Sequence, residues 1–411
     1  MLKTIGTSEY LKAARYVQQQ DFATATGGHR VVFLTNFIPP YRLPALRALG
    51  LHLGTLKTFV STSMEVNRSW TPDWQDLDVD IQKSVSVRKV LRHPDGFDQE
   101  TYVHLPYDTL PKLATFNPDV VISGEMGART MQAVLYRIAT PRSRLIIQAD
   151  LSEYTERGRG HLRNALRRWM LRHADAVLVN GESGARYVRM LGVPESKIFR
   201  VPYATDTSVY LNISRVDDDT NIIKLLHVGQ LIERKGIVSF LERLAKWSAE
   251  HPKHQLELAL VGDGPLRTTI MQFPTPPNLS VRLIQPAAYS AMPEIYSQAD
   301  LLVLPTLADS WALVVNEAMA AGLPILGSRK SQAVEELVTD GESGWVFSPE
   351  NSDELYSALN RALSASKETR LNMGAAARIT AIGVTPQLVA ERTMRAIGYC
   401  FGAQRYQELS A

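Results

Sequence analysis

Short apolar runs alternate with segments of helical spacing along this chain, and the alternation is completed twice. Each apolar run is bounded by polar or glycine-rich turns. Strands of a parallel sheet that is buried on both faces have this pattern, and the helical segments between them are the crossovers that parallel strands need. The sequence therefore predicts an α/β protein with two parallel sheets. The first round comprises residues 30–35, 56–60, 119–123, 144–148 and 176–179, and the second comprises 224–228, 256–261, 280–284, 301–304, 324–326 and 344–347.

The length of 411 residues exceeds what one compact core usually holds, so each round is expected to form its own domain. Two Rossmann-like domains that face each other across a deep cleft follow from this, with ligands at the carboxyl ends of the strands. The expected boundaries are an N-terminal extension over 1–29, a first domain over 30–205, a polar linker over 206–220, a second domain over 221–385 and, over 386–411, a C-terminal helix that crosses back to the first domain.

Composition narrows the class of protein. Hydrophobic residues make up 45% of the chain and charged residues 21%, as in soluble globular enzymes. No run of 18 apolar residues occurs, so no membrane-spanning helix is predicted, and a cytoplasmic location is the simplest interpretation. Cys400 is the single cysteine, which excludes an internal disulfide and a cysteine zinc cluster. The aspartates at 217–219 favour a solvated loop over a metal site, so no metal is expected.

Charge is distributed unevenly between the two halves. Residues 1–205 carry 27 Lys and Arg against 19 Asp and Glu, and the remainder carries 18 against 23. A basic first half suits an anionic partner, such as a membrane surface or a phosphate-bearing acceptor. Arginine-rich faces exposed to solvent are the alternative, and the sequence leaves both open. No nucleic acid partner is expected.

The segment 309–324 carries the most informative motif. It places Asp309 in a loop and Glu317 inside a helix that starts at 312–315. The free amides of a helix start form an anion site, and carboxylates beside them accept hydrogen bonds from sugar hydroxyls. Because side chains lean toward the N-terminus of a helix, Glu317 is expected to reach a ligand there, and a nucleotide sugar suits the combination. The alternative is purely structural: a surface position for Glu317, a turn for Asp309 and a packing anchor at Trp311.

Two loops that contain glycines follow strands of the second round. In 229–236, Gly229 lets the backbone approach a ligand, and Arg234 and Lys235 supply the positive charge that a diphosphate leaving group needs. The loop 262–265 reads Gly-Asp-Gly-Pro and lacks the spacing of the dinucleotide fingerprint, so a nicotinamide enzyme is only weakly supported. Ordinary turns are the alternative for both loops.

In this order and spacing, the motifs resemble those of the retaining glycosyltransferases of the GT-B fold, glycosyltransferase family four. The family signature has two acidic residues with seven between them and then Ala-x-Ala-x-Gly-x-Pro, which corresponds to Asp309 through Pro324. The loops 229–236 and 262–265 match two further family motifs, and 180–183 resembles the domain-closing segment. The resemblance covers roughly residues 30–385.

The resemblance implies transfer of a sugar from a nucleotide diphosphate donor, with retention of the anomeric configuration and without a cofactor or a metal. It places the donor on the second domain, where Lys235 would neutralise the diphosphate, Asp309 would hold the transferred sugar and Glu317 would hold the ribose. Lys235 and Asp309 are thus candidate catalytic residues. The expected donor-binding residues are Gly229, Gln230, Arg234, Lys235, Gly262, Gly264, Asp309, Ser310, Ala312, Leu313, Val314 and Glu317.

Three positions depart from the family pattern. The first acidic position holds the shorter Asp309, which bears on the choice of donor sugar. Gln230 stands where an arginine is usual, and Arg234 is the nearby residue that would replace its charge. The histidine that is common after the fourth strand of the first domain is absent. Asp150, or Glu153 nearby, would take its place, so Asp150 is the third catalytic candidate.

The first domain is expected to bind the acceptor. Loops 36–42 and 124–127 follow the first and third strands of this domain, where the cleft should open. Packing roles within these loops are the alternative. The candidate acceptor-binding residues are Phe37, Tyr41, Arg42 and Glu125.

Residues 157–173 combine six arginines and no acidic residue with apolar residues at helical spacing. A helix of this kind suits an anionic membrane, and it would place the protein in peripheral contact with the inner face of the cell membrane. The interpretation that we favour is an apolar stripe packed on its own domain. The arginines are Arg157, Arg159, Arg163, Arg167, Arg168 and Arg172, and the apolar residues are Leu162, Leu166, Trp169 and Met170.

The sequence thus predicts a glycosyltransferase that moves a sugar from a nucleotide sugar to a hydroxyl of a glycan, a glycolipid or a small molecule, in polysaccharide or glycolipid assembly. A non-catalytic protein that binds sugar nucleotides is one alternative, favoured by Gln230 and by the absent histidine. A nucleotide-sugar epimerase of the same two-domain shape is another. The sequence does not identify the base, the sugar or the acceptor.

Overall fold

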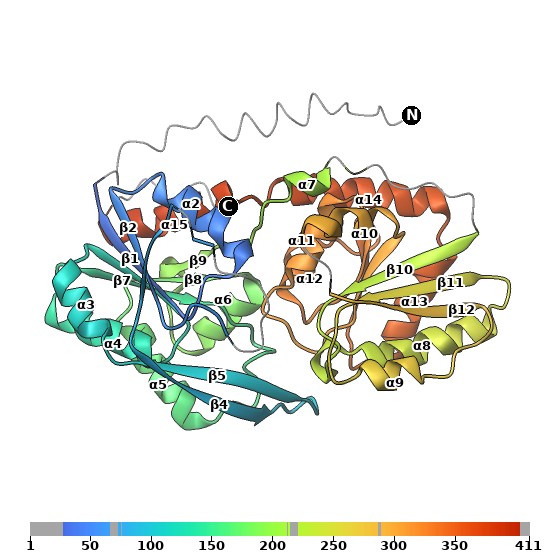
Figure 1. Ribbon diagram of the computed structural model, residues 1–411, viewed down its shortest axis with the longest axis horizontal. Coiled ribbons are helices and arrows are strands. Elements are labelled where there is room, and N and C mark those ends of the chain that lie inside the picture. The colour runs from blue at the N-terminus through green and yellow to red at the C-terminus, as the bar shows by residue number, and fades with distance from the viewer. Residues whose placement is uncertain are drawn as a thin grey trace.

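The computed structural model describes residues 28–65, 73–74, 76–211, 213, 221–286 and 289–402. Within these ranges the chain forms two α/β domains, each built on its own parallel sheet (Figure 1). Most of the expected N-terminal extension and most of the expected linker lie outside the described residues.

The N-terminal domain contains a seven-stranded sheet in the order β3-β2-β1-β6-β7-β8-β9, with parallel pairing throughout. Alternate residues of β1 face opposite sides of the sheet. Val32 and Leu34 pack toward α3–α6, whereas Val31 and Phe33 pack toward α2 and α15. Burial on both faces explains why these strands read as continuous apolar runs. The elements are β1 Arg30–Thr35, η1 Pro40–Arg42, α2 Leu43–Gly50, β2 Thr55–Val60, β3 Asp78–Ile81, α3 Thr109–Phe116, β6 Val120–Gly124, α4 Ala128–Ala139, β7 Arg144–Ala149, α5 His161–Arg172, β8 Ala176–Val179, α6 Glu182–Met190, η2 Glu195–Lys197 and β9 Ile198–Arg200.

An antiparallel hairpin of β4 (Ser84–Arg92) and β5 (Asp98–Pro106) stands apart from the seven-stranded sheet. The sequence analysis did not predict it, nor the short edge strands β3 and β9. Val85, Val87 and Val90 of β4 are exposed and alternate with polar residues. The hairpin therefore lacks the uninterrupted apolar run that marked the buried strands.

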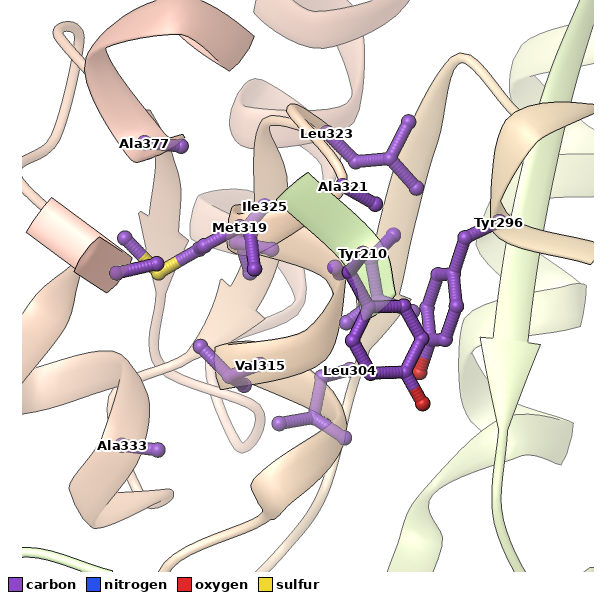
Figure 2. Packing of buried hydrophobic residues seen from close by; sticks show 14 of the residues in the cluster. Tyr210, Tyr296, Leu304, Val315, Met319, Ala321, Leu323, Ile325, Ala333 and Ala377 are labelled. Carbon is purple, nitrogen blue, oxygen red and sulfur yellow. The ribbon is translucent and has the colours of Figure 1, made fainter. Parts of the chain in front are cut away.

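The C-terminal domain contains a six-stranded parallel sheet in the order β12-β11-β10-β13-β14-β15. Helices α8 and α13 cover one face, and α10, α11, α12 and α14 cover the other. Figure 2 shows the second of these cores, in which Val315 and Met319 of α11 pack beside Leu304 of β13. The elements are β10 Ile222–Val228, η3 Glu233–Lys235, α8 Ile237–Glu250, β11 Gln255–Val261, α9 Arg267–Met271, β12 Leu279–Ile284, η4 Tyr289–Ala291, α10 Met292–Ser297, β13 Leu301–Leu304, α11 Leu313–Ala320, β14 Ile325–Ser328, α12 Gln332–Leu337, β15 Gly344–Phe347, α13 Ser352–Ser364 and α14 Lys367–Ile382.

The last helix, α15 (Pro386–Cys400), leaves the C-terminal domain and packs on α2, β8 and β9 of the N-terminal domain (Figure 1). It begins with a proline in its first turn, and the Thr385 hydroxyl caps it by accepting a hydrogen bond from the Leu388 amide at 3.1 Å. Ala390, Ala396 and Ile397 are buried against the N-terminal sheet. The two domains are thus joined by the chain at two places.

The segment expected to be only a polar linker includes a short helix, α7 (Ser208–Leu211). Its Tyr210 is fully buried in the C-terminal core, with its ring centroid 5.5 Å from that of Tyr296 (Figure 2). One large aromatic side chain therefore anchors this part of the connection to the C-terminal domain. The expectation of a polar linker was wrong at this position, because a single apolar anchor in a polar stretch gives no periodic signal.

Candidate active site

Three loops meet at the carboxyl ends of β10, β11 and β13. The Leu231 amide donates a hydrogen bond to the Asp263 carbonyl at 2.9 Å, and the Leu307 amide donates to the Arg234 carbonyl at 2.8 Å. These backbone contacts hold the Gly229–Gly236 loop, which follows β10, between the loops that follow β11 and β13. The motifs that the sequence separates therefore lie together at one edge of the sheet, where α/β proteins bind their ligands.

Glycines allow two of these loops to touch. A Cβ atom at Gly262 would lie 2.0 Å from the Gly229 carbonyl oxygen, and one at Gly264 would lie 2.5 Å from the Leu231 carbonyl oxygen. Both glycines also have positive φ angles, of 146° and 158°. Only glycine fits these positions, so the Gly-Asp-Gly-Pro loop has a packing function in addition to the donor contact expected of it.

An ionic cluster occupies the centre of this edge. The Lys235 Nζ donates to Asp309 Oδ2 at 2.6 Å, and the Arg234 Nη1 lies 3.3 Å from the same oxygen. Burial would raise the pKa of Asp309, but Lys235 and Arg234 outweigh it and hold that pKa well below its usual range. Two cations thus face one carboxylate, which leaves an excess of positive charge at the edge. Across the described ranges, no group of three or more His, Cys, Asp or Glu side chains is arranged to hold a metal ion.

Helix α11 begins directly beside this cluster. Its N-cap is Ala312, which has no polar side chain and lies in the left-handed region at φ 80°. No side chain caps the helix start, so its first amides are left for another partner. Leu313 and Val314, two of the expected donor-binding residues, form the first turn. A strained residue that leaves a helix start uncapped next to cations is a typical arrangement for an anion site.

Glu317 lies one turn inside α11 and is 9% exposed. Its Oε2 accepts a hydrogen bond from the Tyr296 hydroxyl at 2.8 Å. Burial raises the pKa of Glu317 to about 7, an effect that this hydrogen bond partly offsets. A surface role for Glu317 is therefore wrong. Trp311, in contrast, is a packing anchor, since it is buried and donates from Nε1 to Asn316 Oδ1 at 2.9 Å.

A cavity of about 560 Å³ lies in the N-terminal domain and reaches Ser310, which is in the loop between β13 and α11. Its lining includes all four candidate acceptor-binding residues, Phe37, Tyr41, Arg42 and Glu125. The sequence therefore located the walls of this cavity correctly, although it gave no indication that the β4–β5 hairpin and α5 complete it.

Asp150 also lines this cavity, but it is held in an ion pair. Its Oδ2 lies 2.8 Å from Arg42 Nη2, and its Oδ1 accepts a hydrogen bond from Gln148 Nε2 at 2.9 Å. Arg42 Nη2 also donates to the Tyr203 hydroxyl at 2.5 Å. Asp150, the third catalytic candidate, thus has Arg42, a candidate acceptor-binding residue, as its partner, and the two side chains position each other.

Glu125 is the most constrained residue of the acceptor cavity. It lies in the left-handed region at φ 64°, and its carboxylate accepts a hydrogen bond from Asn36 Nδ2. Burial raises the pKa of Glu125, against the opposing effect of Arg129. A carboxyl on a strained backbone at the rim of a cavity is typical of a functional position.

Polar contacts connect the two domains next to the donor loop. Gln332 Nε2 donates to the carbonyls of Ser310 at 2.7 Å and Leu151 at 2.9 Å, and its Oε1 accepts from the Gly184 amide at 2.8 Å. Asn180, in the segment that resembles a domain-closing motif, donates from Nδ2 to the Ser310 carbonyl at 3.2 Å. The sequence did not single out Gln332 or Tyr296, because a lone polar residue on a helix carries no motif.

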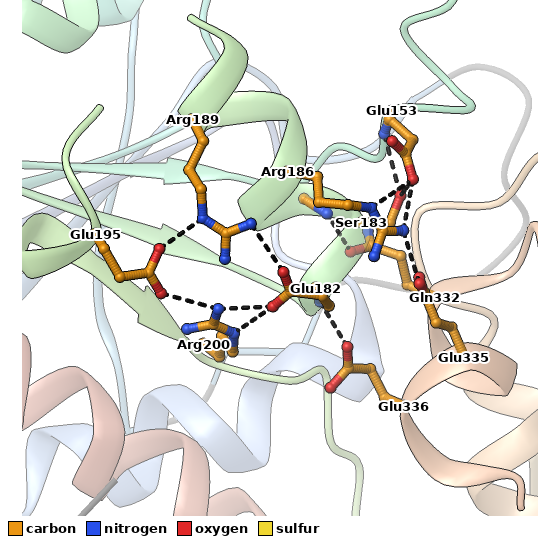
Figure 3. Close-up of polar contacts among 11 residues, drawn as sticks. Glu153, Glu182, Ser183, Arg186, Arg189, Glu195, Arg200, Gln332, Glu335 and Glu336 are labelled. Carbon is orange, nitrogen blue, oxygen red and sulfur yellow. Dashed lines mark hydrogen bonds and ion pairs between the residues drawn. The ribbon is translucent and has the colours of Figure 1, made fainter. Parts of the chain in front are cut away.

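Charged residues extend this interface along α6 (Figure 3). Arg186 Nη2 lies 2.5 Å from Glu153 Oε1 of the N-terminal domain and 2.6 Å from Glu335 Oε1 of α12. The Glu182 amide donates to Glu336 Oε1 at 2.5 Å. Glu153, the second candidate for the place of the absent histidine, is thus part of a bridge between the domains.

Helix α5 differs from the expected amphipathic helix. It begins at His161, and its Arg167 is buried against Glu156 and Tyr187. Arg167 is therefore not part of an exposed basic face, because Glu156, a carboxylate outside 157–173, pairs with it. Leu162 is 86% exposed, so the apolar stripe is not fully packed on the domain either. Among the helices of the described ranges, none combines the length and the apolar character needed to span a bilayer.

Protein-family models match both halves of the chain. The model described as "Glycosyl transferase 4-like domain" matches residues 13–204, and that described as "Glycosyl transferases group 1" matches residues 212–380. The first match covers the N-terminal sheet with its cavity, and the second covers the three donor loops.

Curated relatives show partial similarity. Sulfoquinovosyl transferase SQD2 of Arabidopsis thaliana is 29% identical over 38% of this chain and 29% of its own length. N-acetyl-alpha-D-glucosaminyl L-malate synthase of Bacillus anthracis is 26% identical over 44% of this chain and 49% of its own. The chain thus spans about half or less of the length of these relatives.

Solved structures share the whole architecture. The Anabaena protein HepE in complex with UDP and glucose has a TM-score of 0.66 at 14% identity, covering 90% of this chain and 99% of that chain. Sucrose-phosphate synthase from Thermosynechococcus elongatus has a TM-score of 0.64 at 16% identity, covering 91% and 100%. This likeness shows the GT-B fold, and the two family models, which together match residues 13–204 and 212–380, show that the chain belongs to the group 1 glycosyltransferases.

Proposed function

We propose that this protein is a retaining glycosyltransferase that takes a sugar from a nucleotide diphosphate donor and transfers it to a hydroxyl group. The observation that carries the proposal is the cluster of Lys235, Arg234 and Asp309 beside the uncapped start of α11, with Glu317 buried one turn inside. Cations, free amides and two carboxylates in one place match the parts of a nucleotide sugar.

Each part of the donor has a partner of suitable chemistry. Lys235, Arg234 and the first amides of α11 would bind the diphosphate, whose negative charge increases as it leaves. Glu317 would accept hydrogen bonds from the ribose hydroxyls, and Asp309 from a hydroxyl of the transferred sugar. When the diphosphate arrives, Lys235 and Arg234 gain a second anion, which frees part of the Asp309 carboxylate for the sugar.

The proposed chemical step occurs on one face of the sugar. The acceptor oxygen attacks the anomeric carbon from the side on which the diphosphate leaves, so the configuration is retained. The bond between the anomeric carbon and the phosphate oxygen breaks, and the acceptor proton passes to the leaving diphosphate. Lys235 stabilises the charge that develops on that oxygen. The donor is a substrate, and we propose no resident cofactor or metal.

The names of similar proteins agree with this assignment. The HepE structure contains UDP and glucose, and the curated relatives are a sulfoquinovosyl transferase and an enzyme that forms N-acetylglucosaminyl malate. A glycan, glycolipid or small-molecule acceptor, in polysaccharide or glycolipid assembly, is consistent with these names. The proposed location is cytoplasmic.

Peripheral membrane contact through 157–173 stays a prediction. The exposed side chains of Leu162 and Leu166, together with the exposed Arg168 and Arg172, give α5 an amphipathic surface that an anionic bilayer could bind. Co-sedimentation with anionic vesicles at low salt is the expected result, and a protein that stays in the supernatant would contradict it.

A donor screen tests the proposed function first. We expect one of the uridine, guanosine, adenosine and thymidine diphosphate sugars to raise the melting temperature, because binding to the native state stabilises it. With that donor and an acceptor, the enzyme should release the nucleoside diphosphate, and NMR of the product should show the anomeric configuration of the donor. An inverted product would exclude the retaining step, and conversion of the donor alone would indicate an epimerase.

The assignment of residues is tested by three alanine variants. Lys235→Ala, Asp309→Ala and Glu317→Ala should each lower donor turnover by about a hundredfold or more, as expected for removal of a group that stabilises charge in the transition state or positions the donor. The control is Lys253→Ala, at an exposed position of the same domain. Near-normal turnover in all three variants would overturn the assignment.

A further inference from the structure

The 560 Å³ cavity of the N-terminal domain, which we call the acceptor cavity, has a cationic wall to which the proposed function assigns no role. Lys89 of the β4–β5 hairpin contributes to this wall, as do Arg159, Arg163 and Arg167 of α5 and the segment before it. Figure 1 shows the hairpin beside α5, with its turn directed toward the C-terminal domain. Four cationic side chains from two unrelated segments thus converge on one cavity.

A single carboxylate faces the three arginines of this wall. Glu156 Oε2 lies 2.5 Å from Arg167 Nη1, 3.5 Å from Arg163 Nη2 and 3.6 Å from Arg159 Nε. Glu156 and Arg167 are almost completely buried, whereas the Arg163 side chain is 42% exposed. Arg167 therefore forms the structural pair, and two positive charges remain in excess at this wall.

The other charges of the cavity do not cancel the excess. Its lining contains six Lys and Arg against four Asp and Glu. Asp150 is already engaged by Arg42 at 2.8 Å. Burial lowers the pKa of Arg163 against the effect of Glu156, and the neighbouring Arg167 and Arg159 lower it further. Like charges held close together repel one another, and an additional anion relieves that repulsion.

We infer that the acceptor bound in this cavity carries a phosphate ester, and that Arg159 and Arg163, with Lys89 of the same lining, hold this group. The inference rests on the proposed function, since it names the acceptor class of the same site. A guanidinium group presents parallel N–H donors that match phosphate oxygens, which suits arginine for this task. Ser310 lines the same cavity, so the phosphate at the arginine wall would leave another part of the acceptor near the donor loop.

The test compares binding of ligands that differ only in the phosphate. We expect glucose 6-phosphate to bind to the full-length protein at least tenfold more tightly than glucose in calorimetry, with the donor subsite filled by the nucleoside diphosphate found in the screen. The double variant Arg159→Gln/Arg163→Gln should abolish this difference. Arg142→Gln is the control, because Arg142 lies in the same domain but outside 157–173, is exposed and does not line the cavity. It should bind as the wild type does.

A second arm distinguishes a soluble from a lipid-borne phosphate. Phosphatidylcholine vesicles that contain phosphatidate replace the sugar phosphate, and sedimentation replaces calorimetry. Loss of binding in Arg159→Gln/Arg163→Gln but not in Arg142→Gln supports the inference in either arm, and the arm in which it occurs identifies the source. The inference is overturned if neither probe binds, or if Arg142→Gln weakens binding as much as the double variant.

Two further measurements keep the result interpretable. If the double variant does not fold, which a melting curve will show, the single variant Arg163→Gln replaces it, because this side chain is the more exposed of the two. Binding of the nucleoside diphosphate is measured on the same samples. If the nucleoside diphosphate does not bind while the sugar phosphate does, the assignment of the donor site fails and the anion site stands. If the nucleoside diphosphate binds while the sugar phosphate does not, only the anion site is overturned.

Discussion

Asp309 and Glu317 belong to one motif, yet the structure places them in opposite electrostatic environments. Asp309 has Lys235 and Arg234 within 3.3 Å, and these cations lower its pKa. Glu317 has the neutral Tyr296 hydroxyl as its hydrogen-bond donor, and burial raises its pKa to about 7. One carboxylate is therefore fully ionised in the ligand-free protein, while the other is close to its midpoint at neutral pH.

The raised pKa of Glu317 predicts a pH-dependent stability. The native state keeps the proton of Glu317 up to about pH 7, whereas the unfolded chain loses it near 4.5. Native protein binds more protons in this window, so this group lowers the free energy of unfolding as the pH rises, by about 3 kcal/mol in total. Glu317→Gln should remove this loss and be more stable than the wild type at pH 8, with little difference at pH 4.5. Urea unfolding of both proteins at pH 4.5 and pH 8 measures this difference in stability.

The same substitution, Glu317→Gln, should weaken binding of the donor. An amide is a poorer acceptor for ribose hydroxyls than a carboxylate, so we expect about tenfold weaker nucleoside diphosphate binding in Glu317→Gln at pH 8. Wild-type affinity should increase between about pH 6 and 8 as Glu317 ionises. If Glu317→Gln had the pH profile of the wild type in both measurements, the raised pKa would belong to another group.

At the scale of elements, the donor site depends on loops that touch through their backbones. Gly262 and Gly264 fit against Gly229 and Leu231 with no room for a side chain. The position of Lys235 follows from this packing, because the Gly229–Gly236 loop is held between its two neighbours. The Gly-Asp-Gly-Pro loop thus packs against the Gly229–Gly236 loop in addition to the donor contact that we propose for it.

Gly262→Ala tests this packing. A Cβ atom 2.0 Å from the Gly229 carbonyl oxygen, at φ 146°, must displace one of the loops. We expect a loss of about 3 kcal/mol in the free energy of unfolding and a large loss of donor binding. Gly383→Ala is the control, since Gly383 has φ −74° and a Cβ there would meet its nearest atom at 3.5 Å. Equal stability of the two variants would contradict the packing function.

Elements differed in how well the sequence predicted them. Strands such as β1, β8 and β13 were predicted with the bounds that they have in the structure, because burial on both faces makes them continuous apolar runs. The β4–β5 hairpin was missed because its valines are exposed and alternate with polar residues. The hairpin contributes to the acceptor cavity, so this omission also concealed the cationic wall.

At the scale of the whole molecule, the two halves of the site are held in place by contacts between domains. Gln332 is fully buried and connects the carbonyls of Ser310 and Leu151 with the Gly184 amide. The turn of the hairpin adds a further contact, in which Lys330 Nζ lies 3.1 Å from Asp95 Oδ2. The distance between the donor loop and the acceptor cavity therefore depends on a few polar side chains.

Gln332→Leu should separate donor binding from transfer. The substitution keeps the volume but leaves the Leu151 carbonyl and the Gly184 amide without their Gln332 partner, at a cost of about 1–3 kcal/mol each. We expect nucleoside diphosphate affinity to change little and transfer to the acceptor to fall about tenfold or more, because alignment of the two substrates is lost. Small-angle scattering should show a larger radius of gyration. Gln298→Leu, at an exposed position of the same domain, is the control; equal transfer rates in the two variants would exclude a role for the Gln332 contacts.

Local features of the chain were sufficient to predict the two α/β domains and the family, and they identified candidate donor residues that the structure brings together. Periodicity, glycine positions and the spacing of Asp309 and Glu317 are properties of neighbouring residues, and they act over one strand, loop or helix. The tertiary structure alone decided which carboxylate is ionised, which arginine is buried and which cations meet in the acceptor cavity. Charge and burial at these positions depend on residues such as Glu156, Tyr296 and Gln332, whose partners come from other elements, and no local pattern specifies such contacts.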